Sequence, residues 1–350
     1  MKVAVYYGPM DMRIEERPVP VPGPGQMLVK IEYCGICGTD VESFRRAGMI
    51  PPGMVFGHEN VGTVAALGEG VEGFTVGERI LCGPPAHCAE DCTPCRHGQT
   101  NICTHGFMRT AGIRTYDGGY AEYMLIHDAS HTMLIPVAEG TDPKEAVLFD
   151  VVCVAFHAIR RSRFRLGDDV VVSGAGPIGL SAMRLLRAAG AGRIIALVTG
   201  PAKAELVRSF GADEVIDLSA TEDLKSRVLE ILGRDVGADV VFECAGSPAS
   251  LENCAYYCVK PGGQVMLVGT NGQPMGIAPN RIIPREIDLT PSFVYTAEEV
   301  EAYLRMLASG KLRFRDLVTD TVPLSRCVEL GLDRPDRRNH LKILIDPSLG

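Results

Sequence analysis

An alternation of strand-like and helix-like segments between about residues 151 and 294 constrains the fold more than any other feature of the chain. The apolar run DDVVVSGAG precedes the helix-like PIGLSAMRLLRAAGA, and the alternation recurs down to GGQVMLVGT. Strands that alternate with helices are typical of βαβ units, which build a parallel sheet. We therefore expect residues 151–294 to form a doubly wound α/β domain.

A glycine triplet marks the first strand-to-helix turn of this region. Gly174, Gly176 and Gly179 have the G-x-G-x-x-G spacing, with Pro177 and Ile178 between the last two. The first glycine permits a tight turn, the second lets a pyrophosphate approach, and the third lets the helix pack on the strand. The helix N-terminus offers free N–H groups to phosphate. This predicts a Rossmann dinucleotide site; the alternative is a glycine-rich turn that binds nothing.

The end of the second predicted strand bears on the choice of dinucleotide. An acid about 20 residues after the glycines normally binds the ribose 2′-hydroxyl and disfavours a 2′-phosphate. Val198 stands at this position, and Thr199, Gly200 and Pro201 follow without an arginine. Lys203 is the nearest cation, either as an adenosine-side contact or as an ordinary solvated lysine. We expect NAD, with NADP possible.

The chain before this region has a different rhythm. From residue 1 to about residue 141, short β-like runs such as MLVKIEYCGI and VGTVAALG alternate with Gly and Pro, which is typical of a barrel-like β domain. After it, AEEVEAYLRMLASGKLRF predicts a helix and HLKILID a terminal strand. A length of 350 residues agrees with about two domains.

Four closely spaced cysteines predict a structural metal site. The chain has 12 cysteines and no signal-peptide-like N-terminus, so metal ligation or burial is favoured over disulfides. Four thiolates bind Zn²⁺ tetrahedrally and leave no open position. The alternative is a loop of free or partly oxidised thiols, and His87 and His97 are interpreted as solvated neighbours. The predicted structural-zinc ligands are Cys88, Cys92, Cys95 and Cys103.

A second, dispersed group predicts a catalytic metal. The apolar stretch MVFGHENVG carries His58 and Glu59, Cys37 lies in GICGTD, and Asp150 is flanked by apolar residues. A buried carboxylate needs a partner, and coordinating a cation provides one. One Cys, one His and one carboxylate leave the fourth zinc position open for water or substrate. Taken singly, His58 would more often be a satisfied core histidine, and Cys37 a small buried hydrophobic residue.

With these motifs the chain resembles the zinc-dependent medium-chain alcohol dehydrogenases, especially the sorbitol, butanediol and threonine dehydrogenase branch. The resemblance rests on GICGTD, GHENVG, the cysteine group, DGGYAEY, VAFHAI, GAGPIG and FECAG. It implies a GroES-like β-barrel catalytic domain at residues 1–150, completed by 295–350, and a Rossmann domain at 151–294. It also implies a cleft that holds zinc and nicotinamide.

The resemblance assigns roles to the dispersed group. Cys37, His58 and Asp150 correspond to the catalytic-zinc ligands, with Cys153 as a rival for the third position. Glu59 corresponds to a glutamate behind the metal that enters or leaves its coordination sphere.

Proton transfer is assigned in the same way. Thr39 corresponds to the hydroxyl residue that binds the substrate oxygen and takes its proton. Glu42 stands where many members have a relay histidine, so Glu42 or water would accept the proton. The first gap of the cysteine group is also one residue wider than usual, which would bulge that loop.

The implied reaction oxidises a secondary alcohol or polyol to a ketone, with hydride transfer to NAD(P). An alternative is an anionic hydroxy substrate such as a hydroxyacyl-CoA, and an alternative of another class is a non-catalytic zinc-stabilised nucleotide sensor. The anionic alternative rests on apolar and arginine side chains expected near the pocket: Phe44, Arg45, Arg46, Phe107, Met108 and Arg109.

Charge and hydropathy exclude other classes. A net charge of -8 without a basic stripe disfavours nucleic-acid binding. No uninterrupted apolar run reaches the ~18 residues of a membrane span, so we expect a cytoplasmic protein without a membrane partner. The family resemblance predicts a homodimer or homotetramer, with PSFVYT either pairing across a dimer or forming an internal strand.

Overall fold

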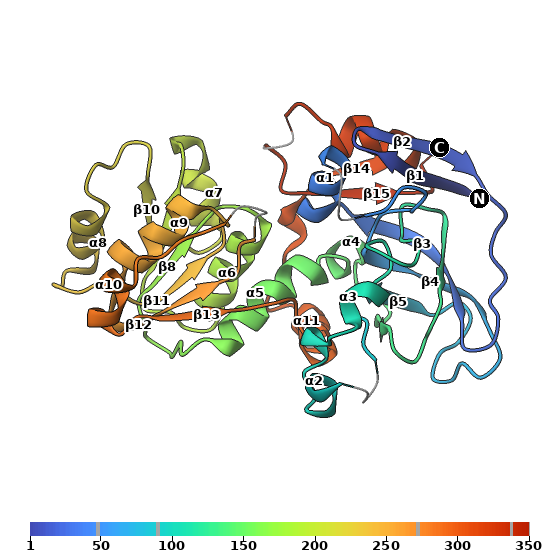
Figure 1. The fold of residues 1–350 in the computed structure, drawn as a ribbon, viewed down its shortest axis with the longest axis horizontal. Helices are drawn as coiled ribbons and strands as arrows, with labels where there is room; N and C mark the ends of the chain where they lie inside the picture. Colours follow the sequence, from blue (N-terminus) through green and yellow to red (C-terminus); the bar gives the residue numbers. More distant parts are fainter. Residues whose placement is uncertain (47–49, 89–91, 271–273, 337–338, 350) are drawn as a thin grey trace. The chain divides into compact units, whose positions relative to one another are not determined.

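The computed structural model describes residues 1–46, 50–88, 92–270, 274–336 and 339–349, apart from the side chain of residue 107. The chain divides into two compact units (Figure 1). The first joins Met1–Asp150 to Val294–Gly350, and the second is Val151–Phe293. Val294, expected in the middle domain, thus belongs to the first unit. Helix α5 (Phe149–Arg161) contains the first boundary between the units.

The second unit is built on a parallel sheet of six strands in the described chain, in the order β10-β9-β8-β11-β12-β13. The order reverses between β8 and β11, which is the position where dinucleotides bind in Rossmann folds. The strands are β8 (Val170–Ser173), β9 (Ile194–Val198), β10 (Glu214–Asp217), β11 (Ala238–Glu243), β12 (Val259–Leu267) and β13 (Asp288–Pro291).

Helices connect these strands (Figure 1). Central strands such as β8 and β9 are buried throughout, as the continuous valine and isoleucine runs require when helices cover both faces of a sheet. The helical segments are α6 (Pro177–Ala188), η2 (Pro201–Lys203), α7 (Ala204–Ser209), α8 (Leu224–Leu232), α9 (Pro248–Glu252), η3 (Asn253–Cys258), α10 (Pro279–Ile282) and η4 (Ile283–Arg285).

Two helical segments of this unit contain other helix types, and one expectation is corrected. A 3-10 turn, η2, begins at Pro201 and leads into α7. The helical run from Pro248 changes to a π-helix at Asn253, and β12 starts directly after it at Val259. Strand β13 ends at Pro291, so most of PSFVYT lies after the strand and the internal-strand alternative is wrong for residues 292–296.

The first unit contains a mixed sheet of seven strands, as far as the chain is described, in the order β14-β15-β3-β4-β5-β7, with β6 also paired to β3. Strands β1 and β2 form a separate antiparallel hairpin. The strands are β1 (Lys2–Gly8), β2 (Asp11–Glu16), β3 (Met27–Gly35), β4 (Glu59–Leu67), β5 (Arg79–Gly83), β6 (Tyr123–Ile126), β7 (Met133–Pro136), β14 (Val318–Pro323) and β15 (Lys342–Asp346).

The two ends of the chain meet in this sheet, because β15 pairs antiparallel with β3 (Figure 1). Apolar side chains from both chain ends form one core, which includes Val29 and Ile345. The helical segments are α1 (Gly38–Arg45), α2 (Thr93–Arg96), η1 (Thr100–Ile102), α3 (Gly106–Arg109), α4 (Pro143–Ala146), α11 (Ala297–Ala308), η5 (Arg315–Leu317), η6 (Leu324–Arg326) and η7 (Val328–Leu332).

None of the described helices has the length and hydropathy needed to cross a bilayer.

Candidate active site

Side chains from three separate segments meet inside the first unit. One ligand atom of each of Cys37, His58, Glu59 and Asp150 lies within 4.8 Å of those of the other three. Cys37 precedes α1, the His58–Glu59 pair stands at the start of β4, and Asp150 lies in the first turn of α5. The structure therefore brings the sequence-predicted ligands together, with Glu59 beside them.

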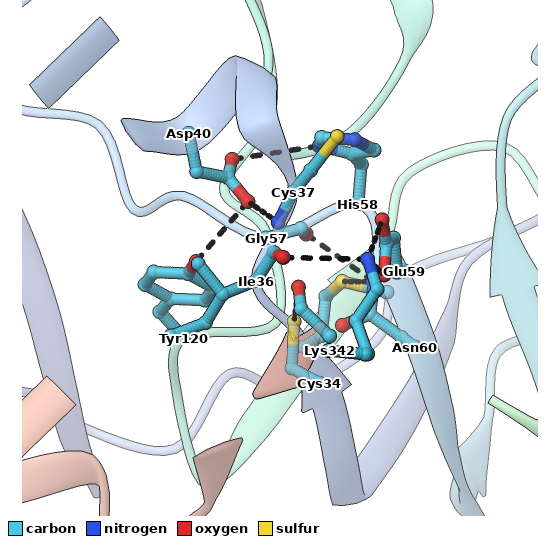
Figure 2. Close-up of polar contacts among 12 residues, drawn as sticks. Cys34, Ile36, Cys37, Asp40, Gly57, His58, Glu59, Asn60, Tyr120 and Lys342 are labelled. Carbon is cyan, nitrogen blue, oxygen red and sulfur yellow. Dashed lines mark hydrogen bonds and ion pairs between the residues drawn. The ribbon is translucent and has the colours of Figure 1, made fainter. Parts of the chain in front are cut away.

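A buried carboxylate that sequence reasoning left without a role lies beside His58. The His58 Nδ1 lies 3.6 Å from Oδ1 of Asp40, and both side chains are buried (Figure 2). Asp40 Oδ2 accepts hydrogen bonds from the Cys37 backbone N–H at 2.9 Å and from the Tyr120 hydroxyl at 3.1 Å. Since Nδ1 faces Asp40, Nε2 is the nitrogen available to a metal. A carboxylate on the far side of a ligating imidazole is common at zinc sites, where it hydrogen-bonds the second ring nitrogen.

Glu59 has a buried cationic partner. The Lys342 ammonium, from β15, lies 2.7 Å from each Glu59 carboxylate oxygen and donates to the Ile36 carbonyl at 3.3 Å (Figure 2). Burial opposes ionisation of Glu59, but Lys342 outweighs it, so the pKa of Glu59 lies below its ordinary value. Gly35 makes room for this pair, because a Cβ there would lie 2.0 Å from Glu59 Oε2.

The remaining electrostatics fit a divalent cation. Burial, reinforced by the charge of Glu59, raises the pKa of Asp150 to about 6. Burial would lower the pKa of His58, yet Asp40 and Cys37 hold it well above its ordinary value. Acidic and thiol groups thus crowd a buried space, and the donor set of sulfur, imidazole nitrogen and carboxylate oxygen is one that zinc accepts. The residues present therefore fit the metal.

Asp150 also has a partner that the sequence did not reveal. The Tyr295 hydroxyl donates to Asp150 Oδ1 at 2.6 Å, and the Tyr295 side chain is fully buried. Of the partners missed by sequence reasoning, Asp40 and Tyr120 lie inside the quoted motifs GICGTD and DGGYAEY and could have been noticed. Lys342 and Tyr295 carry no local signal.

Thr39 and Glu42 lie on α1, directly after Cys37. They are three residues apart, which places them on the same helix face. Thr39 is half-buried, whereas the Glu42 side chain is 47% exposed and has its Oε1 3.7 Å from Arg46 Nη1. Glu42 thus stands at the solvent end of that face.

The four predicted structural-zinc ligands, here called the lobe cysteines, also lie close together: Cys88, Cys92, Cys95 and Cys103. Their sulfur atoms lie within 4.8 Å of one another, with Cys88 to Cys95 at 3.8 Å and Cys92 to Cys103 at 3.9 Å. This arrangement matches a closed four-thiolate zinc site. The bulge expected in the wider first gap, residues 89–91, lies outside the described residues.

The arginines expected near the pocket are paired with carboxylates. Arg45 lies 3.9 Å from Asp333, and Arg109 binds Asp128 at 2.6 Å. Phe44 is buried in the core and Met108 is 49% exposed, while the side chain of Phe107 lies outside the described part of the structure. With the ion pair of Arg46 noted above, each of these arginines has an acidic partner.

The glycine turn of the second unit has the geometry of a phosphate cradle. Gly174 has φ +107°, and a Cβ on Gly179 would lie 2.0 Å from the Gly174 carbonyl oxygen, so helix and strand pack too closely for a side chain. Gly176 is the N-cap of α6 and a Cβ there would meet open space. Pro177 and Ile178 are the first two residues of α6. The unpaired N–H groups of the first helical turn therefore lie next to Gly176, where no side chain blocks a ligand.

The end of β9 is shaped by the neighbouring strand. Val198 is buried, and Thr199 is exposed. Asp217, paired in register with Val198, accepts the Gly200 backbone N–H at 2.9 Å on Oδ1. Hydrogen bonds from Ser219 and Gly200 hold the pKa of Asp217 below its ordinary value, so it is ionised at neutral pH. Lys203 ends the following 3-10 turn.

Glu243, in the FECAG motif, folds the loop opposite the glycine turn. Its Oε1 accepts the N–H groups of Ala245 at 3.0 Å and Gly246 at 2.9 Å, and the hydroxyl of Ser250 at 2.6 Å. A Cβ on Gly174 would lie 3.0 Å from the Ala245 nitrogen, so loop and turn are in close contact.

Comparisons with known proteins identify the family of the chain. The model "Alcohol dehydrogenase GroES-like domain" matches residues 23–137, and "Zinc-binding dehydrogenase" matches residues 177–309. The chain is 30% identical to sorbitol dehydrogenase of Bacillus subtilis (99% of this chain, 98% of that protein) and 28% identical to (R,R)-butanediol dehydrogenase of Neisseria gonorrhoeae (100% of each).

A solved structure extends this likeness to the fold. A zinc-binding dehydrogenase of Sinorhizobium meliloti, bound to NADP, superimposes with a TM-score of 0.89 at 28% identity, and 99% of each chain is covered. The expected combination of a GroES-like and a Rossmann domain is confirmed. The chain therefore belongs to the zinc-dependent medium-chain alcohol dehydrogenases and is an enzyme of the alcohol dehydrogenase class.

Proposed function

We propose that this enzyme oxidises a secondary alcohol or polyol to a ketone with NAD as the hydride acceptor. The observation that carries the proposal is the convergence of Cys37, His58 and Asp150, a three-ligand set of the kind that catalytic zinc uses. When bound, zinc supplies Lewis-acid polarisation of the alcohol oxygen, and the nicotinamide supplies the hydride acceptor. Glu59 stands beside the ligands and remains neutralised by Lys342.

The protein's own groups would move the proton. The Thr39 hydroxyl accepts the proton of the alcohol as it releases its own toward the Glu42 carboxylate, one helical turn away at the solvent surface. Asp40, on the Nδ1 side of the His58 imidazole, would stabilise the ring orientation that leaves Nε2 for the metal. A Thr39→Val variant should lose most turnover, whereas Thr39→Ser should keep it.

The turn after β9 favours NAD over NADP. The Asp217 carboxylate accepts the Gly200 N–H at this turn, and its negative charge opposes a 2′-phosphate there. The segment from Thr199 to Lys203 contains no arginine.

A neutral substrate is favoured over an anionic one. Both relatives compared above act on polyols or diols, according to their names. The arginines that would attract an anion are paired with acidic side chains. The four lobe cysteines would hold a second, structural zinc.

A ligand-replacement series tests the site. Cys37→Ser and Asp150→Asn should lose the catalytic zinc and turnover, with the circular dichroism spectrum retained. Cys153→Ala, which removes the rival ligand, should keep the catalytic zinc and the turnover. The substrate class follows from a screen of polyols, secondary alcohols and acyl thioesters with NAD and NADP, read by absorbance of the reduced nicotinamide. Undiminished turnover in Cys37→Ser would count against the proposal.

A further inference from the structure

Tyr295 lies in a connection that begins at the end of β13 and ends at α11. The Ser292 N–H is bound to the Leu267 carbonyl at 2.9 Å, and the Thr296 N–H is bound to Glu299 Oε2 at 2.9 Å. Each end of the connection is therefore held within its own unit, and three residues lie between them.

The backbone of this connection is held in an unfavourable conformation. Val294 has φ +55°, a region that side chains branched at Cβ avoid because of steric clash. Such a conformation persists only when the surroundings impose it, and it is found preferentially at functional sites. The residue that it positions is Tyr295, which follows directly.

The Tyr295 side chain ends at a sequence-predicted zinc ligand. Its ring is fully buried and packs edge-on against Phe149, with ring centroids 6.0 Å apart and planes at 83°. Its hydroxyl donates to Asp150 Oδ1 at 2.6 Å. A neutral donor on one oxygen restricts the carboxylate rotamer without adding a charge at the site.

We propose that Tyr295 is a positioning residue for the metal, acting through Asp150, and that the strained Val294 fixes its direction. The proposal rests on the proposed function in one respect, namely that Asp150 ligates the catalytic zinc. Hydrogen bonds to ligating carboxylates fix their orientation, and losing them commonly weakens metal affinity about 10–100-fold.

The test compares two buried tyrosines in the holoenzyme. Tyr295→Phe removes the hydroxyl that binds Asp150, whereas Tyr303→Phe removes one that binds the Glu145 carbonyl at 2.6 Å, away from the predicted ligands. Zinc affinity is measured by chelator competition, with Cys37→Ser identifying the signal of the structural zinc. The visible spectrum of the cobalt-substituted protein reports the ligand geometry separately from activity.

We expect Tyr295→Phe to weaken catalytic-site zinc binding at least about 10-fold and to shift the cobalt spectrum, with Tyr303→Phe unchanged in both. Val294→Gly relaxes the backbone but keeps Tyr295, so it should change zinc affinity and the cobalt spectrum in the same direction by less. If Tyr295→Phe does not fold, Val294→Gly provides the test. Wild-type zinc affinity and spectrum in the folded variants would overturn the inference. If the wild type and Cys37→Ser bind the same amount of zinc, the proposed function itself fails.

Discussion

Lys342 holds Glu59 by both carboxylate oxygens, each 2.7 Å from the ammonium nitrogen, and both side chains are buried beside the candidate metal site. The ion pair lies next to the predicted ligands and adds no net charge to the site. Glu59 belongs to β4 and Lys342 to β15, and the two residues are 283 positions apart in the sequence.

Removing Lys342 should therefore destabilise the first unit strongly. Lys342→Met leaves a buried carboxylate without a counter-ion, and breaking a buried pair in this way costs about 3–5 kcal/mol. The double variant Glu59→Gln/Lys342→Met should recover part of that loss. Urea unfolding of the wild type, the single variants and the double variant measures the coupling, and additive losses would show that the two charges do not depend on each other.

Cys95→Ser should remove the structural zinc without abolishing catalysis. Zinc content should fall from two equivalents to one, since only one of the two ligand clusters is changed. The lobe around α2 and η1 should become more sensitive to protease, because its fold depends on the metal. Cys258→Ala, a buried cysteine of the second unit, is the control. Metal analysis and limited proteolysis provide the measurements, and two equivalents of zinc in Cys95→Ser would contradict the assignment.

Asp217→Asn should shift the enzyme toward NADP. The substitution removes the negative charge at the end of β9, so the ratio of kcat/KM for NADP to that for NAD should rise about 10-fold, or ~1.4 kcal/mol. Asp223→Asn is the matched control, because this exposed carboxylate caps α8 in the same unit. An unchanged ratio in Asp217→Asn would leave the carboxylate with a purely structural role.

Asp239→Asn should show a pH-dependent loss of stability. Burial opposes ionisation of Asp239, but hydrogen bonds from Lys260 and Arg234 outweigh it, so its pKa lies below the ordinary value of 3.8. A lowered pKa stabilises the folded protein above the unfolded-state pKa, and this contribution fades as pH falls through the folded-state pKa. Urea unfolding should show a loss of about 1–3 kcal/mol at pH 7. The loss should shrink below about pH 4, and a loss that stays constant with pH would exclude the mechanism.

The sequence anticipates what is encoded locally. The alternation of strands and helices predicts the Rossmann unit, because the spacing of apolar residues and the glycines of turns determine structure over a few residues. Gly174 has the positive φ expected for a tight turn, and Gly179 leaves no room for a side chain between helix and strand. Cys37 and His58 could be linked only through family motifs, since nothing in their own surroundings requires them to meet. Their roles as ligands, like those of Thr39 and Glu42, stay predictions.

What the sequence does not reveal depends on long-range pairing. Lys342 lies in a short apolar strand, and only the β15–β3 register directs it to Glu59. Tyr295 follows a backbone conformation that valine disfavours, so local propensity argues against its placement. Strand β13 includes only the first residue of PSFVYT, because its pairing with β12 ends at Pro291.

The sharing of one sheet by β3 and β15 has a consequence for biosynthesis. A nascent chain presents Glu59 long before residue 342 leaves the ribosome, whereas residues 151–293 emerge as a complete unit in between. During translation the Glu59 carboxylate therefore stays without its counter-ion, hydrated or bound by a chaperone, until β15 supplies Lys342.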